Sequence, residues 1–242
     1  MDPTETPKPG GRGATGKGVV DFLSDAIRGG RFVPGQRLVE ADLTRELGVS
    51  RGPVREAFRR LAAEGLIEVV PNRGALVRRL SATEALELFE IRTELEAFAA
   101  RRAAGRMCDT DAGARFRCAV ASVWDHAPRH STAAYIAENQ RFHAAIIEAA
   151  GNRELVALNW RLQLSLILAQ IGAALTSEII AASLAEHRTI AAAILDGDAA
   201  AADRAIREHL GRAMALLRTM PPEVFRQERP KAASGGSSGG RR

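Results

Sequence analysis

Three histidines, each on an otherwise apolar helix face, are the residues best placed for chemistry in this chain. At about 100° per residue on a helical wheel, His143 shares its face with Asn139 and several isoleucines. His187 and His209 each lie among isoleucine, leucine and alanine side chains on their own predicted helices. Imidazole rings in the middle of apolar faces are expected to be buried, and buried imidazoles need polar partners.

The spacing of the last two histidines brings them together. His187 and His209 lie equally far from Asp198, which follows Gly197 in a predicted turn between two helices. Folding this helical hairpin antiparallel places the two imidazoles at the same depth. The alternative is three separate core histidines, each bonded to a backbone carbonyl or a hydroxyl. Because a divalent metal satisfies three imidazoles at once, we predict a metal site inside a helical bundle.

Composition and charge limit the class of protein. The chain has 242 residues and a net charge of +5, which allows two modest domains. Residues 1–80 carry 14 Lys and Arg against 10 Asp and Glu, while residues 81–220 carry 15 against 17. A basic first third suits a polyanionic partner. Cys108 and Cys118 are too few for a disulfide framework, and no signal peptide or membrane span is evident. We therefore expect a cytoplasmic protein with no membrane partner.

The first third has the element order of a winged helix-turn-helix. Helices are predicted at 18–27 and 39–47, and a third runs from Ser50 to about Gly65, with Pro53 in its first turn. Two short strands at 67–70 and 75–77 flank a hairpin tip. Three helices followed by a hairpin predict a DNA-binding domain over residues 17–80, after a disordered Pro/Gly-rich segment over residues 1–16.

The remainder is predicted to be helical. A capping box at Ser81 and Glu84 opens the second domain, and helix breaks near Gly105, Pro128, Gly151, Gly172 and Gly197 give about six helices with no strand. We expect a mainly α protein: an N-terminal winged helix-turn-helix with a small β-hairpin, and a C-terminal antiparallel bundle over residues 81–220. The last segment, 221–242, is expected to be a disordered basic tail.

Arginines gather where a winged helix meets DNA. The second helix of the motif enters the major groove by its N-terminus, and Arg can contact guanine with both prongs of its guanidinium. A bare backbone at Gly52 lets a phosphate approach the helix end. The alternative is that these arginines form only a solvated face. The predicted DNA-contacting residues are Ser50, Arg51, Gly52, Arg55, Arg59, Arg73 and Gly74.

Two runs carry a family resemblance. One begins Pro34-Gly35-x-x-Leu38-x-Glu40, and the other reads Leu47-Gly48-Val49-Ser50-Arg51-x-Pro53-Val54-Arg55-Glu56-Ala57. Together they resemble the winged helix of GntR-type bacterial transcription regulators over about residues 18–80. The resemblance implies DNA contacts by the residues matching Ser50, Arg51, Gly52, Arg55, Arg73 and Gly74. Gly52 stands where threonine is commoner, which implies that one hydroxyl contact is missing.

The second domain is similar to the all-helical effector (FCD) domain of the FadR branch of that family over about residues 84–218. Metal-binding members have Asp-x-x-x-His on one helix and a histidine on each of the last two, which match Asn139, His143, His187 and His209. Asn139 replaces the usual aspartate and is a neutral, weaker ligand. The resemblance implies a divalent zinc, nickel, iron or manganese ion with a position open for a small organic acid.

Arg92 and Glu96 lie in the centre of another apolar face. A buried arginine needs an anion, and the pair can satisfy each other along one helix. The sharper hypothesis is that Arg92 also binds the carboxylate of the effector with both prongs of its guanidinium. The family commonly has an arginine at this place.

These observations predict a homodimeric transcription regulator, a repressor rather than an enzyme, that binds double-stranded DNA at an inverted repeat. A small carboxylate at the metal would control operator affinity. The rival hypotheses are a metal-independent ligand sensor such as an acyl-CoA sensor, a three-histidine metalloenzyme, and a purely architectural DNA binder. The enzyme is disfavoured because no HExxH motif is present and because Glu186 and Glu208 point about 100° away from their neighbouring histidines.

Overall fold

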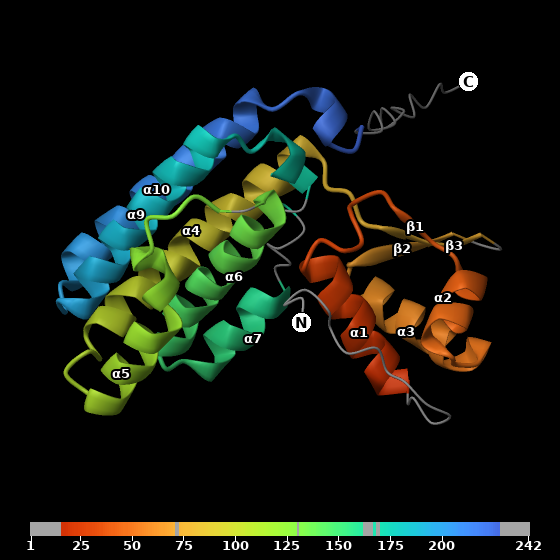
Figure 1. Ribbon diagram of the computed structural model, residues 1–242, viewed down its shortest axis with the longest axis horizontal. Coiled ribbons are helices and arrows are strands. Elements are labelled where there is room, and N and C mark those ends of the chain that lie inside the picture. The colour runs from red at the N-terminus through yellow and green to blue at the C-terminus, as the bar shows by residue number, and fades with distance from the viewer. Residues whose placement is uncertain (1–15, 71–72, 130, 162–166, 168–169, 228–242) are drawn as a thin grey trace, which may run out of the picture.

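The computed structural model describes residues 16–70, 73–129, 131–161, 167 and 170–227. A small winged helix lies at one end of the molecule and a larger helical bundle at the other (Figure 1). The predicted fold class is confirmed: helices dominate, and the one sheet described has three short strands. The described residues contain no helix long and apolar enough to cross a membrane.

The winged helix is built from three helices and a three-stranded antiparallel sheet. Its elements are α1 (Gly16–Arg28), β1 (Arg37–Leu38), α2 (Glu40–Leu47), α3 (Arg51–Ala63), β2 (Ile67–Val70) and β3 (Gly74–Val77), with strand order β1-β3-β2. Each helix buries one apolar stripe, such as Val54, Phe58 and Leu61 on α3. Gly48 ends α2 in a left-handed conformation (φ 64°), which glycine adopts without steric cost.

Two details of the winged helix differ from the sequence prediction. Ser50 occupies the N-cap position of α3, but its side chain makes no capping hydrogen bond. The strand β1 is only two residues long, too short to give a periodic pattern, and was not predicted. It pairs with β3 in the register Arg37 to Leu76 and Leu38 to Ala75.

The wing turns tightly at Gly74. This residue has φ +89°, and a Cβ atom there would lie 2.3 Å from the carbonyl oxygen of Leu38. Any side chain would collide with the backbone of β1. Gly74 is therefore required by the fold itself, whatever it does toward DNA.

The bundle consists of antiparallel helices around α4. Its helices are α4 (Ala82–Ala104), α5 (Thr110–Ala119), α6 (Thr132–Ala149), α7 (Arg153–Arg161), α9 (Ser177–Leu195) and α10 (Ala199–Thr219), with short 3₁₀ turns at Ala121–Trp124 and Gly172–Ala174. Helices α4, α9 and α10 lie side by side on one side of α6 (Figure 1). The capping box at Ser81 and Glu84 is present at the start of α4.

The C-terminal segment is ordered further than predicted. Residues 221–227 were assigned to a disordered tail, but Pro222–Val224 form a 3₁₀ turn and Phe225 is buried. The backbone N–H of Arg226 donates to the carbonyl of Leu80 (2.9 Å), and its guanidinium pairs with Glu84. The Arg79 guanidinium also donates to the carbonyl of Val224 (3.1 Å). An aromatic anchor and a few tertiary hydrogen bonds thus hold this segment, and none of them leaves a periodic signal in the sequence.

The two domains are joined by specific hydrogen bonds. Gln170 accepts from the backbone N–H of Leu80 and donates to its carbonyl, both at 2.9 Å. Gln140 on α6 donates to the carbonyl of Arg28 at the end of α1 (2.7 Å). Both contacts link the bundle to the winged helix.

Candidate sensor site and DNA interface

The three predicted histidines meet inside the bundle. His143 on α6, His187 on α9 and His209 on α10 are all buried, and one ring nitrogen from each lies within 4.8 Å of the others. The ring centroids of His187 and His209 are 4.8 Å apart, as their equal distance from Asp198 predicts. Phe142 stacks on His187 at 4.2 Å between ring centroids and fixes that ring.

Three ring nitrogens in the cluster have no hydrogen-bond partner among the described residues. They are Nε2 of His143 and both ring nitrogens of His187, all of them buried. Burial lowers the pKa of His143 to about 4, lowers that of His187 well below its usual value, and lowers that of His209. The three imidazoles are therefore neutral near pH 7, which is the form that binds a metal.

A carboxylate supports each of two histidines from behind. Glu96 on α4 lies 2.5 Å from Nδ1 of His143, and Glu186 on α9 lies 2.7 Å from Nδ1 of His209. A carboxylate on Nδ1 fixes the tautomer with its hydrogen there, so that Nε2 carries the free lone pair. The wheel of α9 predicted only that Glu186 points about 100° away from His187, and in the structure its carboxylate contacts His209 on the neighbouring helix α10.

Each of these carboxylates is held by an arginine. Arg92 donates to Glu96 (2.5 Å), and Arg212 donates to Glu186 (2.6 Å). Burial opposes ionisation of Glu96, but the Arg92 guanidinium and the contact with His143 together outweigh it and hold the pKa of that carboxyl at about 2. Arg92 and Glu96 thus satisfy each other along one helix, and Glu96 is directed at His143.

A cavity of about 40 Å³ lies beside the histidines. Arg92, Asn139, His143, His209 and Arg212 line it, with Tyr135, Ser183 and apolar side chains. The Tyr135 hydroxyl lies 2.8 Å from Ser183 Oγ and 3.4 Å from the amide oxygen of Asn139. Arg212, Tyr135 and Ser183 are polar lining residues that the sequence analysis did not identify. Each lies three or four residues from a predicted site residue on its own helix, a spacing that could have found them.

The donor set fits a divalent metal ion. Two ligand atoms about 2.1 Å from one ion lie about 3 to 4 Å apart, so small rotations of the imidazoles are enough to close the site. Nitrogen ligands with carboxylates behind them are the arrangement that orients imidazoles in metal sites. The unpartnered nitrogens of His187 are the observation that a set of separate core histidines does not explain.

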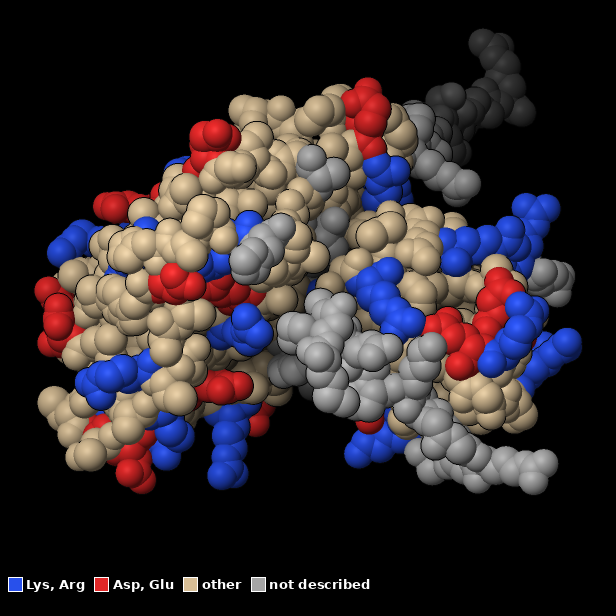
Figure 2. All heavy atoms as spheres, in the orientation of Figure 1, with Lys and Arg blue, Asp and Glu red and all other residues tan. Residues whose placement is uncertain are grey.

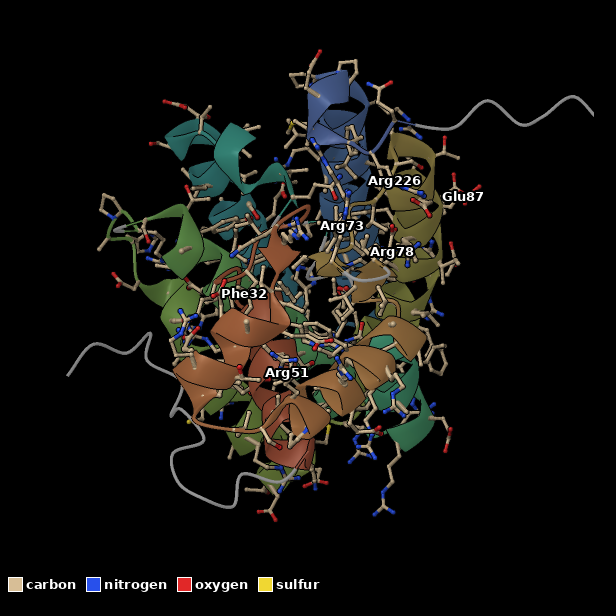
Figure 3. The ribbon with its side chains drawn as sticks, turned by 90° about the vertical axis from the view of Figure 1, so that its right-hand side faces the viewer. Phe32, Arg51, Arg73, Arg78, Glu87 and Arg226 are labelled. Atoms are coloured by element: carbon tan, nitrogen blue, oxygen red, sulfur yellow. The ribbon has the colours of Figure 1, made fainter. Side chains whose placement is uncertain are left out.

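The start of α3 is open to solvent. Arg51 and Gly52 are exposed, and the nearest atom to a Cβ built at Gly52 is Ser50 Oγ at 4.0 Å. The backbone at Gly52 is therefore bare, as predicted. Arg51 faces the viewer in Figure 3, on the outer end of the winged helix.

Arg55 is positioned by an acid on the preceding helix. Its Nε donates to both carboxylate oxygens of Glu40, at 3.0 and 3.2 Å. This contact leaves the two terminal nitrogens of the guanidinium free for another partner. Arg59, one turn further along, pairs with Glu56 (3.3 Å).

The wing adds a second basic group. Arg73 is exposed and faces the same side as Arg51 (Figure 3). Its carbonyl accepts from Nε of Arg37 on β1 (2.9 Å), which brings another arginine to the wing. Lys and Arg side chains project from this end of the molecule with acidic side chains between them (Figure 2). Sequence reasoning did not place Arg37 and Glu40 beside the predicted DNA-contacting residues, because only the pairing of β1 with β3 and the packing of α2 against α3 bring them there.

A winged helix with arginines at its exposed helix start, joined to a helical bundle with a buried polar cavity, defines a DNA-binding regulator with a separate sensor domain. The comparisons with known proteins agree. Residues 15–77 match the bacterial regulatory proteins of the gntR family, and residues 87–212 match the FCD domain. The chain belongs to the GntR family and carries an FCD domain. It is a transcription regulator, not an enzyme.

Individual relatives cover most of the chain. It is 30% identical over 196 residues to "HTH-type transcriptional repressor GlaR" of Escherichia coli K12, covering 78% of this chain and 89% of that protein. It is 33% identical over 193 residues to "Probable D-xylose utilization operon transcriptional repressor" of Paenarthrobacter nicotinovorans, covering 79% and 84%. A GntR transcriptional regulator from Rhodococcus sp. RHA1 superposes with a TM-score of 0.67 at 26% identity, covering 84% of this chain and 97% of that one.

Proposed function

We propose that this chain is a homodimeric, cytoplasmic repressor whose affinity for an inverted-repeat operator is controlled by a small carboxylate bound at a divalent metal. His143, His187 and His209 hold the metal, and Asn139 lines the same cavity as a weaker oxygen ligand. The observation that carries the proposal is the pair of buried, unpartnered nitrogens on His187. Both relatives named above are called repressors, which supports the sign of regulation.

The metal supplies a Lewis acid that a carboxylate oxygen can bind. Arg92 and Arg212 line the cavity and add positive charge for the same anion. A rival in which the ligand needs no metal is supported by the same two arginines. Effector binding changes the affinity for the operator only if the DNA-bound and DNA-free forms of the protein bind the effector with different affinities.

A thermal-shift screen of small carboxylates, with and without a chelator, tests the site directly. We expect a carboxylate to raise the melting temperature, the chelator to remove the shift, and added zinc, nickel, iron or manganese to restore it. A shift that is indifferent to chelator would place the ligand on Arg92 and Arg212 alone. Chelator destabilisation with no response to any acid would make the metal structural and contradict acid sensing.

The DNA interface is proposed to consist of Ser50, Arg51, Gly52, Arg55, Arg59, Arg73 and Gly74. If Arg55 reads a base, Arg55→Ala should weaken operator binding by about 1–3 kcal/mol and relax specificity at one position. Binding can be measured by fluorescence anisotropy on DNA selected by the protein from a random library. Equal losses on selected and random DNA would make Arg55 a phosphate contact instead.

A further inference from the structure

Four buried side-chain atoms have no hydrogen-bond partner in the described part of the chain, and one of them lies outside the histidine cluster. Three are the ring nitrogens of His143 and His187 discussed above, and the fourth is Nε of Arg106. Arg106 follows the C-terminal end of α4, in the turn that leads to α5. A buried N–H of a charged group is costly to leave without an acceptor, so this atom needs a physical explanation.

The backbone beside Arg106 does not satisfy its Nε. Arg102, one turn earlier, donates its own Nε to the carbonyl of Ala150 at the C-terminal end of α6 (3.2 Å). The guanidinium of Arg106 lies against the next residue, Gly151, where a Cβ atom would be 2.7 Å from Cζ of Arg106. The glycine therefore leaves room for the guanidinium, while Nε of Arg106 remains without an acceptor.

Arg106 lines a cavity of about 100 Å³. The other polar side chains of the wall are Arg115 on α5 and Glu148 on α6, and the rest of the wall consists of alanines and Phe116. Helix α5 lies at the end of the bundle away from the winged helix (Figure 1). At about 30 Å³ per water molecule, the cavity has room for about three waters or for one small anion.

The charges at this cavity favour an anion. Arg106 has no ion pair within the described residues, and Arg115 has only a 3.9 Å contact with the exposed Asp111, which contributes little. Asp109 is near both arginines, but its carboxylate accepts from two backbone N–H groups at the start of α5. In the wall itself, two guanidiniums face one carboxylate, that of Glu148.

We propose that this cavity is a second anion site, which binds the phosphate or carboxylate group of a small molecule through Arg106 and Arg115. Nε and one terminal nitrogen of a guanidinium can donate together to two oxygens of such a group. The anion supplies the acceptor that Nε of Arg106 lacks. It also joins the turn after α4 to helix α5.

The anion site is separate from the metal site. Its wall residues Ala145 and Glu148 follow His143 on α6 by two and five residues, which correspond to rotations of about 200° and 140°. The two sites therefore use different faces of this helix. The proposal does not depend on the metal or on the effector proposed above.

Thermal unfolding of the full-length protein in phosphate or acetate tests the site. Chelator is present throughout to keep the metal site empty, and sodium chloride holds the ionic strength constant. We expect one or both anions to raise the melting temperature of the wild type in a saturable way, and the anion that does so identifies the group that the site prefers. A general salt effect on stability, in contrast, is shared by all variants.

Replacing one arginine removes a charged donor. Arg106→Gln should raise the half-saturating concentration at least about tenfold, because a charge-assisted hydrogen bond is lost. Arg117→Gln is the matched control, since Arg117 is an exposed arginine of α5 that does not line the cavity. This variant should respond to the anion as the wild type does.

A second pair of variants keeps both arginines and changes only the space. Ala119 lines the cavity and is exposed, so Ala119→Leu fills the site at little cost to the fold and should abolish the response. Ala114→Leu, at an exposed position of α5 outside the cavity wall, is its control. Glu148→Gln should lower the half-saturating concentration, because it removes a negative charge beside the anion. Circular dichroism shows whether each variant is folded.

Two results would overturn the proposal. The first is a wild type whose melting temperature shows no saturable response to either anion. The second is an equal response in the wild type and Ala119→Leu, which would place the anion elsewhere, such as on Arg92 and Arg212. Neither result bears on the proposed metal site, because that site is kept empty by the chelator.

Discussion

Both ring nitrogens of His187 are buried and have no hydrogen-bond partner in the part of the chain that the structure describes, and this makes the effect of replacing the residue depend on metal. In metal-free protein, His187→Phe removes two unsatisfied polar atoms and keeps the stack on Phe142, so we expect it to raise stability by about 1–3 kcal/mol. With saturating metal the wild type gains the binding free energy and the variant does not, so the order reverses. Urea unfolding in chelator and in excess metal measures both values. An identical difference in the two conditions would contradict the metal site.

The carboxylates behind the histidines give a second prediction at this scale. Glu186 contacts Nδ1 of His209, and such supporting partners typically change metal affinity by about 10- to 100-fold. We expect Glu186→Gln to weaken metal binding within this range in a competition titration with a chromophoric chelator. Glu208→Gln, an exposed neighbour of His209, is the control. Equal affinities for the two variants would remove Glu186 from the site.

Residue patterns predicted the three histidines, but not that the carboxylates of Glu96 and Glu186 contact two of them. A polar residue in the middle of an apolar face is visible on the wheel of its own helix, which is how His143, His187 and His209 were found. Glu186 is aimed at a residue of the next helix, and the wheel of α9 carries no information about that contact. The wheels also gave Asn139, Arg92 and Glu96, whereas Tyr135, Ser183 and Arg212 were not singled out although each lies three or four residues from a predicted site residue on its own helix.

At the scale of elements, the N-terminus of α4 is capped by the charged side chain of Glu84, which also pairs with Arg78 and Arg226. Partial burial alone would raise the pKa of Glu84, but the backbone N–H of Ser81 and the guanidiniums of Arg226 and Arg78 lower it to about 2. A carboxyl with a lowered pKa stabilises the fold above its unfolded pKa, and this contribution is lost as pH falls toward its folded pKa. We expect the stability gap between wild type and Glu84→Gln to be full at pH 6 and to shrink between about pH 5 and pH 2.

The measurement is thermal or urea unfolding of the two proteins along a pH series. Glu87→Gln, on the exposed face of the same helix, is the matched control and should show no such narrowing. A gap between wild type and Glu84→Gln that stays constant down to pH 2 would show that the cap does not depend on the charge of Glu84.

The helices and the wing hairpin could be predicted because each depends on a pattern of residues that are close together in the sequence. The apolar stripes, the capping box at Ser81 and the glycines after helices gave the helices and their approximate ends. The strand β1 is two residues long, and the ordering of residues 221–227 depends on Phe225 and on a bond to Leu80. Both are decided by tertiary contacts, which local periodicity does not contain.

At the scale of the whole molecule, α6 connects the cavity to the DNA-binding domain. Asn139 lines the cavity, and the next residue, Gln140, donates to the carbonyl that ends α1. If the effector acts through α6, Gln140→Ala should leave metal and ligand binding unchanged but reduce the effect of the ligand on operator affinity. The measurement is operator binding with and without a stabilising carboxylate. Gln36→Ala, in the turn before β1, is the control. An undiminished response would place the coupling elsewhere, such as at Gln170.

The equal arms of the α9–α10 hairpin set where this chain tolerates changes in length. His187 and His209 face each other only because each lies the same number of residues from Asp198 in the turn. One residue inserted within either arm rotates its histidine by about 100° and shifts it by about 1.5 Å, which removes it from the cluster. Insertions at the turn itself, or beyond His209, leave both rings in place. Alignments of homologues that keep the histidines should therefore show gaps at this turn and none in the two arms.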